Sequence, residues 1–213
     1  RVMKAIDRNL YERVLRLHFA AFVHRVFLTL SPATPYLPNW HIDAIAWHLQ
    51  QVAAGELRRL IITMPPRHLK SLCASVAFPA WLLGRDPTSR VVCASYSGDL
   101  AAKHALDCRA IMNAAWYREL FPTTRISPRR DQECDFMTTK MGYRFATSVG
   151  GTLTGRGGNV IIVDDPLKPE DAMSDAKRTA VNEWFRRTLY SRQDDKRSAA
   201  IVMRACQWRP VGI

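Results

Sequence analysis

Short apolar runs alternate with helix-length segments through most of this 213-residue chain. The runs have the length of buried strands, and they lie at residues 60–64, 90–95, 160–163 and 199–203. Strands that alternate with helices form a mostly parallel sheet covered by helices on both faces. The sequence therefore predicts an α/β fold of three layers.

The first 39 residues differ from this alternating pattern. Apolar side chains recur at helical spacing at Leu10, Val14, Leu17 and Ala21, which predicts one helix over residues 7–29. Three prolines within residues 31–39 indicate a loop. We therefore divide the chain into an N-terminal helical segment with a proline-rich loop, residues 1–39, and an α/β domain, residues 40–213.

Within the α/β domain, the segments between the strands are predicted to be helices or turns. A helix is expected from about His41 to a cap at Gly55, and the others at residues 71–83, bent near Pro79, 99–112 and 170–191. Residues 136–139 and 143–148 are expected to pair as a hairpin around Gly142.

The net charge indicates which kind of partner the protein binds, and the cysteine content indicates which cellular compartment it occupies. The formal net charge is +12, which favours a polyanionic partner, most simply nucleic acid, although charge alone leaves open a basic protein without one. The five cysteines form no CxxC pair and no zinc-ligand spacing with histidine, which indicates reduced thiols in a cytosolic compartment. No run is long and apolar enough to span a membrane, so no membrane partner is expected.

The stretch LIITMPPRHLKSL, residues 60–72, has the layout of a phosphate-binding loop: a strand, a tight loop, Lys-Ser and a helix. In such loops the lysine, here Lys70, reaches the β- and γ-phosphates, and the serine, here Ser71, binds magnesium. Met64 and Leu69 occupy the positions where the pattern GxxxxGK[ST] has glycine. On this pattern alone, a strand followed by a basic turn is an equally good interpretation.

The stretch VIIVDDP, residues 160–166, is an apolar strand that ends in two carboxylates. A buried parallel strand delivers its last residues to the sheet edge where ligands bind. There Asp164 would hold Mg²⁺, and Asp165 would act as the general base on the attacking water. The alternative is a turn that only caps the strand, but the Lys70-Ser71 pair in the same α/β pattern favours a nucleotide site. We expect both pairs to meet at the carboxyl edge of one sheet.

Several segments, in order, resemble the large terminase subunits of tailed bacteriophages, the ATPases that package DNA. The resemblance covers about residues 36–203 and includes WHIDAIAWHLQQVAAGELRRLIITMPPRHLKS, FPAWLLGRDP, VVCASYSGDLAAKHALDCRAIM, TSVGGTLTGRGGNVIIVDDPLKPEDAMS and EWFRRTLYSR. The family's Walker A loop typically reads PPRHGKS, without the first glycine. The resemblance implies an ASCE-type P-loop ATPase domain with ATP and Mg²⁺ as cofactors.

The resemblance also implies roles for individual residues. The nucleotide would be bound by Pro66, Arg67, His68, Leu69, Lys70 and Ser71, with Trp40 and His41 near the adenine. Arg67 would stabilise the γ-phosphate, and Arg156 would be an arginine finger that reaches a neighbouring subunit. The alternatives are a surface arginine for Arg67, a solvated loop arginine for Arg156 and a core tryptophan for Trp40.

The function that the resemblance implies is ATP-driven translocation of double-stranded DNA into a phage procapsid. The implied partners are double-stranded DNA, the small terminase subunit and the portal protein, with a homo-oligomeric ring on the portal, in the cytoplasm of the bacterial host. One alternative is a truncated prophage remnant with impaired hydrolysis that binds only DNA or partner subunits. Another is a helicase-like ATPase outside phage biology, which should lack the TLTGRG and DDP context.

Three features depart from the family pattern. Leu69 replaces the glycine before the lysine, and if that position has positive φ, leucine must be strained or move the loop. The sequence RACQWRPVGI after Met203 has only scattered agreement with the family's coupling motif. The C-terminal nuclease domain is absent from the sequence, so we expect the ATPase domain only, with activity impaired by Leu69 and by truncation.

Overall fold

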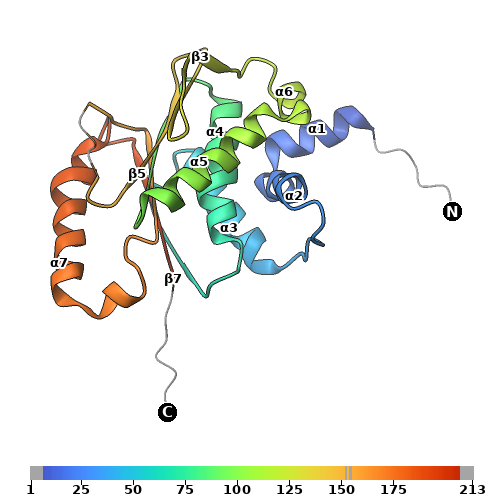
Figure 1. The fold of residues 1–213 in the computed structure, drawn as a ribbon. Coiled ribbons are helices and arrows are strands. Elements are labelled where there is room, and N and C mark those ends of the chain that lie inside the picture. The colour runs from blue at the N-terminus through green and yellow to red at the C-terminus, as the bar shows by residue number, and fades with distance from the viewer. Residues whose placement is uncertain (1–6, 152, 154, 207–213) are drawn as a thin grey trace.

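The computed structural model describes residues 7–151, 153 and 155–206, and its seven strands form one sheet (Figure 1). The order across the sheet is β1-β7-β6-β2-β5-β4-β3. The strands are β1 Arg59–Met64, β2 Arg90–Ser95, β3 Ile126–Asp131, β4 Asp135–Thr138, β5 Tyr143–Ser148, β6 Val160–Asp164 and β7 Ala200–Cys206.

The strands from β1 to β5 in this order are parallel, and β4 and β3 continue the sheet in antiparallel pairing. The predicted hairpin is confirmed as β4 and β5, although β3 beyond it was not predicted. β7 lies between β1, which leads into the Lys-Ser loop, and β6, which ends in the two aspartates. A side chain near the carboxyl end of β7 therefore lies between the Lys70-Ser71 pair and the Asp164-Asp165 pair.

Helices cover both faces of the sheet, as the alternating pattern predicts. The helices are α1 Arg8–Leu17, α2 Phe19–Leu30, α3 Trp40–Ala53, α4 Phe78–Arg85, α5 Gly98–Asn113, α6 Ala115–Leu120 and α7 Asp175–Trp184. Shorter or π-helical segments are η1 Leu72–Ala77, η2 Glu170–Met173, η3 Phe185–Leu189 and η4 Tyr190–Arg192. Figure 1 shows α7 on one side of the sheet and α3, α4 and α5 on the other.

Strand β6 shows how the two layers of helices are joined to the sheet. Side chains alternate between the faces of a strand. Val160 and Ile162 accordingly pack into the large core under α2 to α5, and Ile161 and Val163 into the smaller core under α7. Because both faces are covered, the strand is apolar throughout until Asp164.

The predicted single helix over residues 7–29 is wrong, because the backbone is extended at His18 and separates α1 from α2. Gln50 of α3 stabilises this break: its Oε1 accepts from the Phe19 amide at 3.0 Å, and its Nε2 donates to the Leu17 carbonyl at 3.2 Å. The break changes the phase of the helix. Leu10 and Leu17 are therefore exposed, and Leu15 is buried in their place.

Six aromatic side chains from α2, α4, α6 and the following turn pack together on the outer side of the large core. We call this group the aromatic cluster; its members are Phe19, Phe22, Phe78, Trp81, Tyr117 and Phe121, all of them buried. The rings of Phe19 and Trp81 lie 5.2 Å apart, and Trp81 Nε1 donates to the Leu15 carbonyl at 3.2 Å. The aromatic cluster thus packs the N-terminal helices α1 and α2 against α4 and α6 of the α/β domain.

The helix predicted after the Lys-Ser pair is present as η1 followed without interruption by α4, and the change from π- to α-helix falls next to Pro79. The helix predicted over residues 170–191 is divided, because Ser174 is extended and its side chain caps the start of α7. Gly55 has φ +79, as expected for the cap that follows α3.

Candidate active site

The loop after β1 has left-handed backbone at two residues that are not glycine. Arg67 and Leu69 have φ of 64° and 56°, in the left-handed region that L residues rarely adopt. The Leu69 side chain is half-buried and packs against the large core, which holds the strained residue in place. Of the two outcomes expected for leucine here, the structure has the strained conformation, at a cost of about 1–3 kcal/mol.

Lys70 is buried and turned back onto its own loop. Its Nζ donates to the Met64 carbonyl at 2.7 Å and also to the Pro65 carbonyl. The ammonium group therefore lies at the end of β1, where a phosphate-binding lysine is expected. Burial raises the pKa of Asp164, and the charge of Lys70 is one of several influences that act against this rise.

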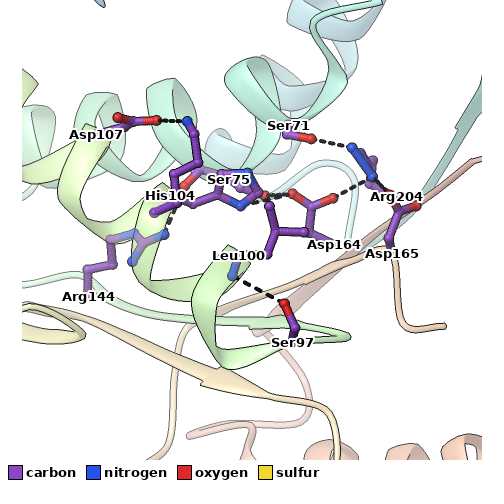
Figure 2. Close-up of polar contacts among 11 residues, drawn as sticks. Ser71, Ser75, Ser97, Leu100, His104, Asp107, Arg144, Asp164, Asp165 and Arg204 are labelled. Carbon is purple, nitrogen blue, oxygen red and sulfur yellow. Dashed lines mark hydrogen bonds and ion pairs between the residues drawn. The ribbon is translucent and has the colours of Figure 1, made fainter. Parts of the chain in front are cut away.

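Both aspartates at the end of β6 meet a single arginine from β7 (Figure 2). Arg204 Nη1 lies 2.8 Å from Asp164 Oδ1 and also donates to Asp165 Oδ2, while its Nη2 donates to the Ser71 hydroxyl. Backbone pairing places Arg204 directly opposite Asp164. We call Ser71, Asp164, Asp165 and Arg204 the edge cluster, and it brings the two predicted motifs together at the carboxyl edge of the sheet.

A second layer of polar side chains lies behind Asp164 (Figure 2). Ser75, in the π-helical segment η1, donates from Oγ to Asp164 Oδ2 at 2.6 Å. His104 Nδ1 lies 3.4 Å from the same oxygen, and Arg144 Nη2 donates to the Ser75 carbonyl at 3.0 Å. These contacts fix the orientation of the Asp164 carboxylate from the side opposite Arg204.

Burial sets the protonation of this layer. Burial raises the pKa of Asp164, while Arg204 and the Ser75 hydrogen bond act against this rise. Burial, followed by the charges of Arg144, Lys103 and Arg204, lowers the pKa of His104 to about 4. His104 is therefore neutral at pH 7, and its contact with Asp164 is not an ion pair.

The remaining residues of the loop lie around these groups. Arg67 is exposed and has no hydrogen bond or ion pair with any residue that the structure describes. His68 Nδ1 lies 2.7 Å from the Pro66 carbonyl, and its ring meets His41 edge-on at 5.2 Å. Pro66 and Asp165 line one cavity of about 410 Å³. Arg67 is thus available to a ligand, while His68 connects the loop to α3.

Trp40 and His41 line a cavity of about 260 Å³ beside the edge strand β1, which ends at Met64 where the loop begins. Trp40 is 78% exposed, so the alternative of a core tryptophan is wrong. Burial, followed by the nearby His68, lowers the pKa of His41. An uncharged histidine and an exposed indole beside the loop form a surface on which a flat aromatic base can stack.

Arg156 lies away from the edge cluster. Its guanidinium forms an ion pair with Asp135 at 2.6 Å and lies over the rings of Phe145 and Tyr143 at 5.4 and 5.8 Å. Tyr143 begins β5, so this position is near the amino ends of the parallel strands. The structure does not bring Arg156 together with the other predicted site residues.

Sequence reasoning missed Arg204, Ser75 and His104. The strand over residues 199–203 was predicted one residue short of Arg204, and its position next to β6 is a property of sheet order. Ser75 reaches Asp164 from a π-helical turn, which no sequence spacing indicates. An arginine directly after the apolar run IVM was the one signal that pointed to the carboxyl edge.

Magnesium favours hydroxyl and carboxylate oxygens, and Ser71 Oγ and the Asp164 carboxylate already share one cation, the Arg204 guanidinium. These residues therefore fit a Mg²⁺ site. No group of three or more His, Cys, Asp or Glu side chains suited to a metal occurs among the described residues, so further ligands would come from phosphate or water. No helix within the described ranges is long and apolar enough to cross a membrane.

A scan against models of protein families finds no match, and a search of curated proteins also finds none. Among solved structures, the large terminase of bacteriophage HK97 is similar, with a TM-score of 0.53 and 14% sequence identity over 89% of this chain and 37% of that chain. The large terminase ATPase domain of Thermus phage P74-26 is also similar, with a TM-score of 0.46 and 16% identity over 86% of this chain and 75% of that chain.

This chain thus spans little more than a third of the HK97 protein. The similarity covers 89% of this chain, whose sheet has the strand order β1-β7-β6-β2-β5-β4-β3. The chain therefore has an α/β fold similar to that of the matching part of the HK97 large terminase.

Proposed function

We propose that this chain binds Mg-ATP at the carboxyl edge of its sheet and hydrolyses it, as the ATPase part of a DNA-packaging terminase. The observation that carries the proposal is the edge cluster. A Lys-Ser loop and two strand-end carboxylates, far apart in the sequence, converge on one cation. A turn that merely caps a strand has no reason to gather these groups.

The loop supports a division of roles. Lys70 would exchange the carbonyls of Met64 and Pro65 for phosphate oxygens, and the exposed Arg67 would contact the γ-phosphate. Ser71 and Asp164 would hold Mg²⁺, which when bound would neutralise charge on the β- and γ-phosphates.

Other residues would position the base and the water. Trp40 and His41 would contact the adenine from their cavity beside β1. Asp165 would accept the proton of the attacking water, for which its ion pair with Arg204 has to open. Arg156 remains a candidate arginine finger for a neighbouring subunit, and that role requires it to leave Asp135.

The charge supports double-stranded DNA as the moving partner. A net charge of +12 favours phosphate contacts that release counterions, so binding should be independent of sequence and should weaken steeply with salt. The small terminase subunit, the portal protein and a ring of copies on the portal complete the proposed assembly, in the cytoplasm of a bacterial host. Each cycle of ATP hydrolysis would move double-stranded DNA into the procapsid.

A second candidate is a protein that binds nucleotide, DNA or partner subunits but hydrolyses ATP poorly. Two observations favour it: Leu69 strains the loop, and Arg204 neutralises the carboxylate proposed as the base. Both candidates share the nucleotide site and differ in turnover.

The test is Mg²⁺-dependent phosphate release from ATP, with and without double-stranded DNA. Asp165→Asn should lower the rate by about 10²-fold or more, the typical contribution of a general base. The matched control is Asp175→Asn, a fully solvated aspartate of α7, which should keep the wild-type rate. Absence of phosphate release from the wild-type chain, with ATP binding retained, would decide for the second candidate.

A further inference from the structure

Arg204 makes the contacts that the proposed metal ion would make. Its guanidinium meets the Ser71 hydroxyl and Asp164 Oδ1, the two groups proposed to hold Mg²⁺, and it also meets Asp165. One positive side chain thus stands where the site needs a cation.

The Asp164 carboxylate is buried and therefore needs a positive charge close to it. The side chains of Asp164 and Arg204 are 1% and 9% exposed. A buried carboxylate without a nearby positive charge is strongly destabilising. The contact of Arg204 Nη1 with Asp164 Oδ1 at 2.8 Å compensates the charge of this carboxylate.

Arg204 and a metal ion exclude each other from these oxygens. Magnesium binds its ligands at about 2.0–2.1 Å, and a guanidinium nitrogen that donates to the same oxygen stands in its coordination shell. The positive charges would also repel each other. Either cation can occupy the position between Ser71 and Asp164, but not both.

The exchange requires motion of the side chain only. The backbone of Arg204 is paired with Ile62 of β1 on one side and Asp164 of β6 on the other, and its carbonyl accepts from the Asp165 amide at 2.8 Å. Strand β7 is thus held from both sides. The guanidinium can rotate away from Ser71 while the strand stays in place.

We propose that Arg204 is a built-in counter-cation of this site, which competes with the divalent metal for Ser71 and Asp164. The proposal rests on the proposed function, because it concerns the metal of the same nucleotide site. It follows that the metal ion binds poorly on its own. It binds well together with a triphosphate, because the phosphate oxygens add metal ligands and negative charge. Arg204 therefore sets the order of binding.

The experiment titrates Mn²⁺ alone, without nucleotide, and follows the electron paramagnetic resonance signal of the free ion. Arg204→Gln removes the positive charge and should raise Mn²⁺ affinity by about tenfold or more, the scale of one charge at a buried site. The control is Arg109→Gln, which breaks the exposed ion pair with Asp131 and should leave Mn²⁺ affinity unchanged. Equal or weaker Mn²⁺ binding by Arg204→Gln would overturn the proposal.

A second variant covers the case in which Arg204→Gln does not fold. Arg204→Lys keeps the charge but has one nitrogen, so it cannot hold Ser71 and both aspartates together, and it should give intermediate Mn²⁺ affinity. Affinity equal to that of the wild type would contradict the proposal. Since nucleotide is absent from these titrations, tighter Mn²⁺ binding in a chain that fails to bind ATP would refute the proposed function and leave the counter-cation role standing.

Discussion

The aromatic cluster and the edge cluster are both buried, but they are held by opposite kinds of interaction. In the aromatic cluster, rings such as Phe19, Phe22 and Trp81 pack at 5.2–6.4 Å, and the exposed Arg85 lies over the Trp81 ring at 4.4 Å. In the edge cluster, two carboxylates and an arginine share one small volume. Apolar burial stabilises a fold directly, whereas a buried ion pair often gives no net stability, because both ions lose their hydration.

The difference indicates what each region is for. The aromatic cluster joins α1 and α2 to the domain and needs no ligand to be complete. The edge cluster combines buried charge with left-handed backbone at Asp165, and Leu69 in the adjoining loop is left-handed as well; both features cost free energy. Such costs are typical of functional sites. Substitutions in the first region should therefore change stability, and substitutions in the second should change binding as much as stability.

The largest effect is expected from Trp81→Ala in the aromatic cluster. The side chain is fully buried, so its removal leaves a cavity and should lower the free energy of unfolding by about 3–5 kcal/mol. Urea unfolding followed by circular dichroism measures this. Trp47→Ala is the control, since Trp47 is 59% exposed and should change stability by less than about 0.5 kcal/mol. Similar losses for both variants would contradict the role of the cluster.

A smaller effect is expected from Ser75→Ala behind the edge cluster. The variant removes the hydroxyl that donates to Asp164 at 2.6 Å, and a lost hydrogen bond to a buried charged group costs about 1.5–3 kcal/mol. Ser198→Ala removes the same type of bond, to Asp195 at 2.9 Å, on the surface, where water replaces the lost partner, so its effect should be much smaller. Equal costs in urea unfolding would mean that the Asp164 carboxylate is not held by Ser75.

The pH dependence of stability distinguishes the two regions further. Because the folded-state pKa of His104 is about 4, below the ordinary 6.5, unfolded chains bind a proton between these values that folded chains do not. Stability from His104 is therefore complete above pH 6.5 and is lost as the pH falls towards 4, by at most about 1.4 kcal/mol per pH unit.

The raised pKa of Asp164 acts in the opposite direction above pH 3.8, so the measured slope should be smaller than this limit. His104→Gln should flatten the profile of unfolding free energy between pH 4.5 and 6.5, and His48→Asn, at an exposed position, should not. An unchanged profile in His104→Gln would show that another group controls acid stability.

The smallest effect is expected from Leu69→Gly on ATP affinity. From the sequence we expected Leu69 to impair activity, but Leu69 adopts the left-handed backbone, with φ of 56°. The strain is then present before and after binding, so affinity should change by less than about threefold, or 0.7 kcal/mol. A gain of tenfold or more in calorimetry would show that leucine holds the loop away from its binding conformation.

The sequence was sufficient to predict those parts of the structure that follow from the local pattern of apolar and polar residues. Strands β1, β2 and β6 fall on the predicted apolar runs, and the Lys-Ser and Asp-Asp pairs meet because parallel strands end at one edge. Prediction from the sequence failed where the structure depends on a contact with a residue that is distant in the sequence. The break at His18 depends on Gln50 of α3, and the contact of Arg204 with Asp164 depends on the placement of β7 between β1 and β6.

Titration calorimetry of ATP with the wild-type chain and with Lys70→Ala, each in the presence and absence of Mg²⁺, tests the central claim most directly. The account predicts one Mg²⁺-dependent site, weakened in Lys70→Ala by about tenfold or more, the value of a charge-assisted contact to phosphate. Lys103→Ala, which removes an exposed lysine paired with Asp107, should bind as the wild type does. Absence of binding by the wild type, or equal affinity in Lys70→Ala, would contradict a nucleotide site at the carboxyl edge.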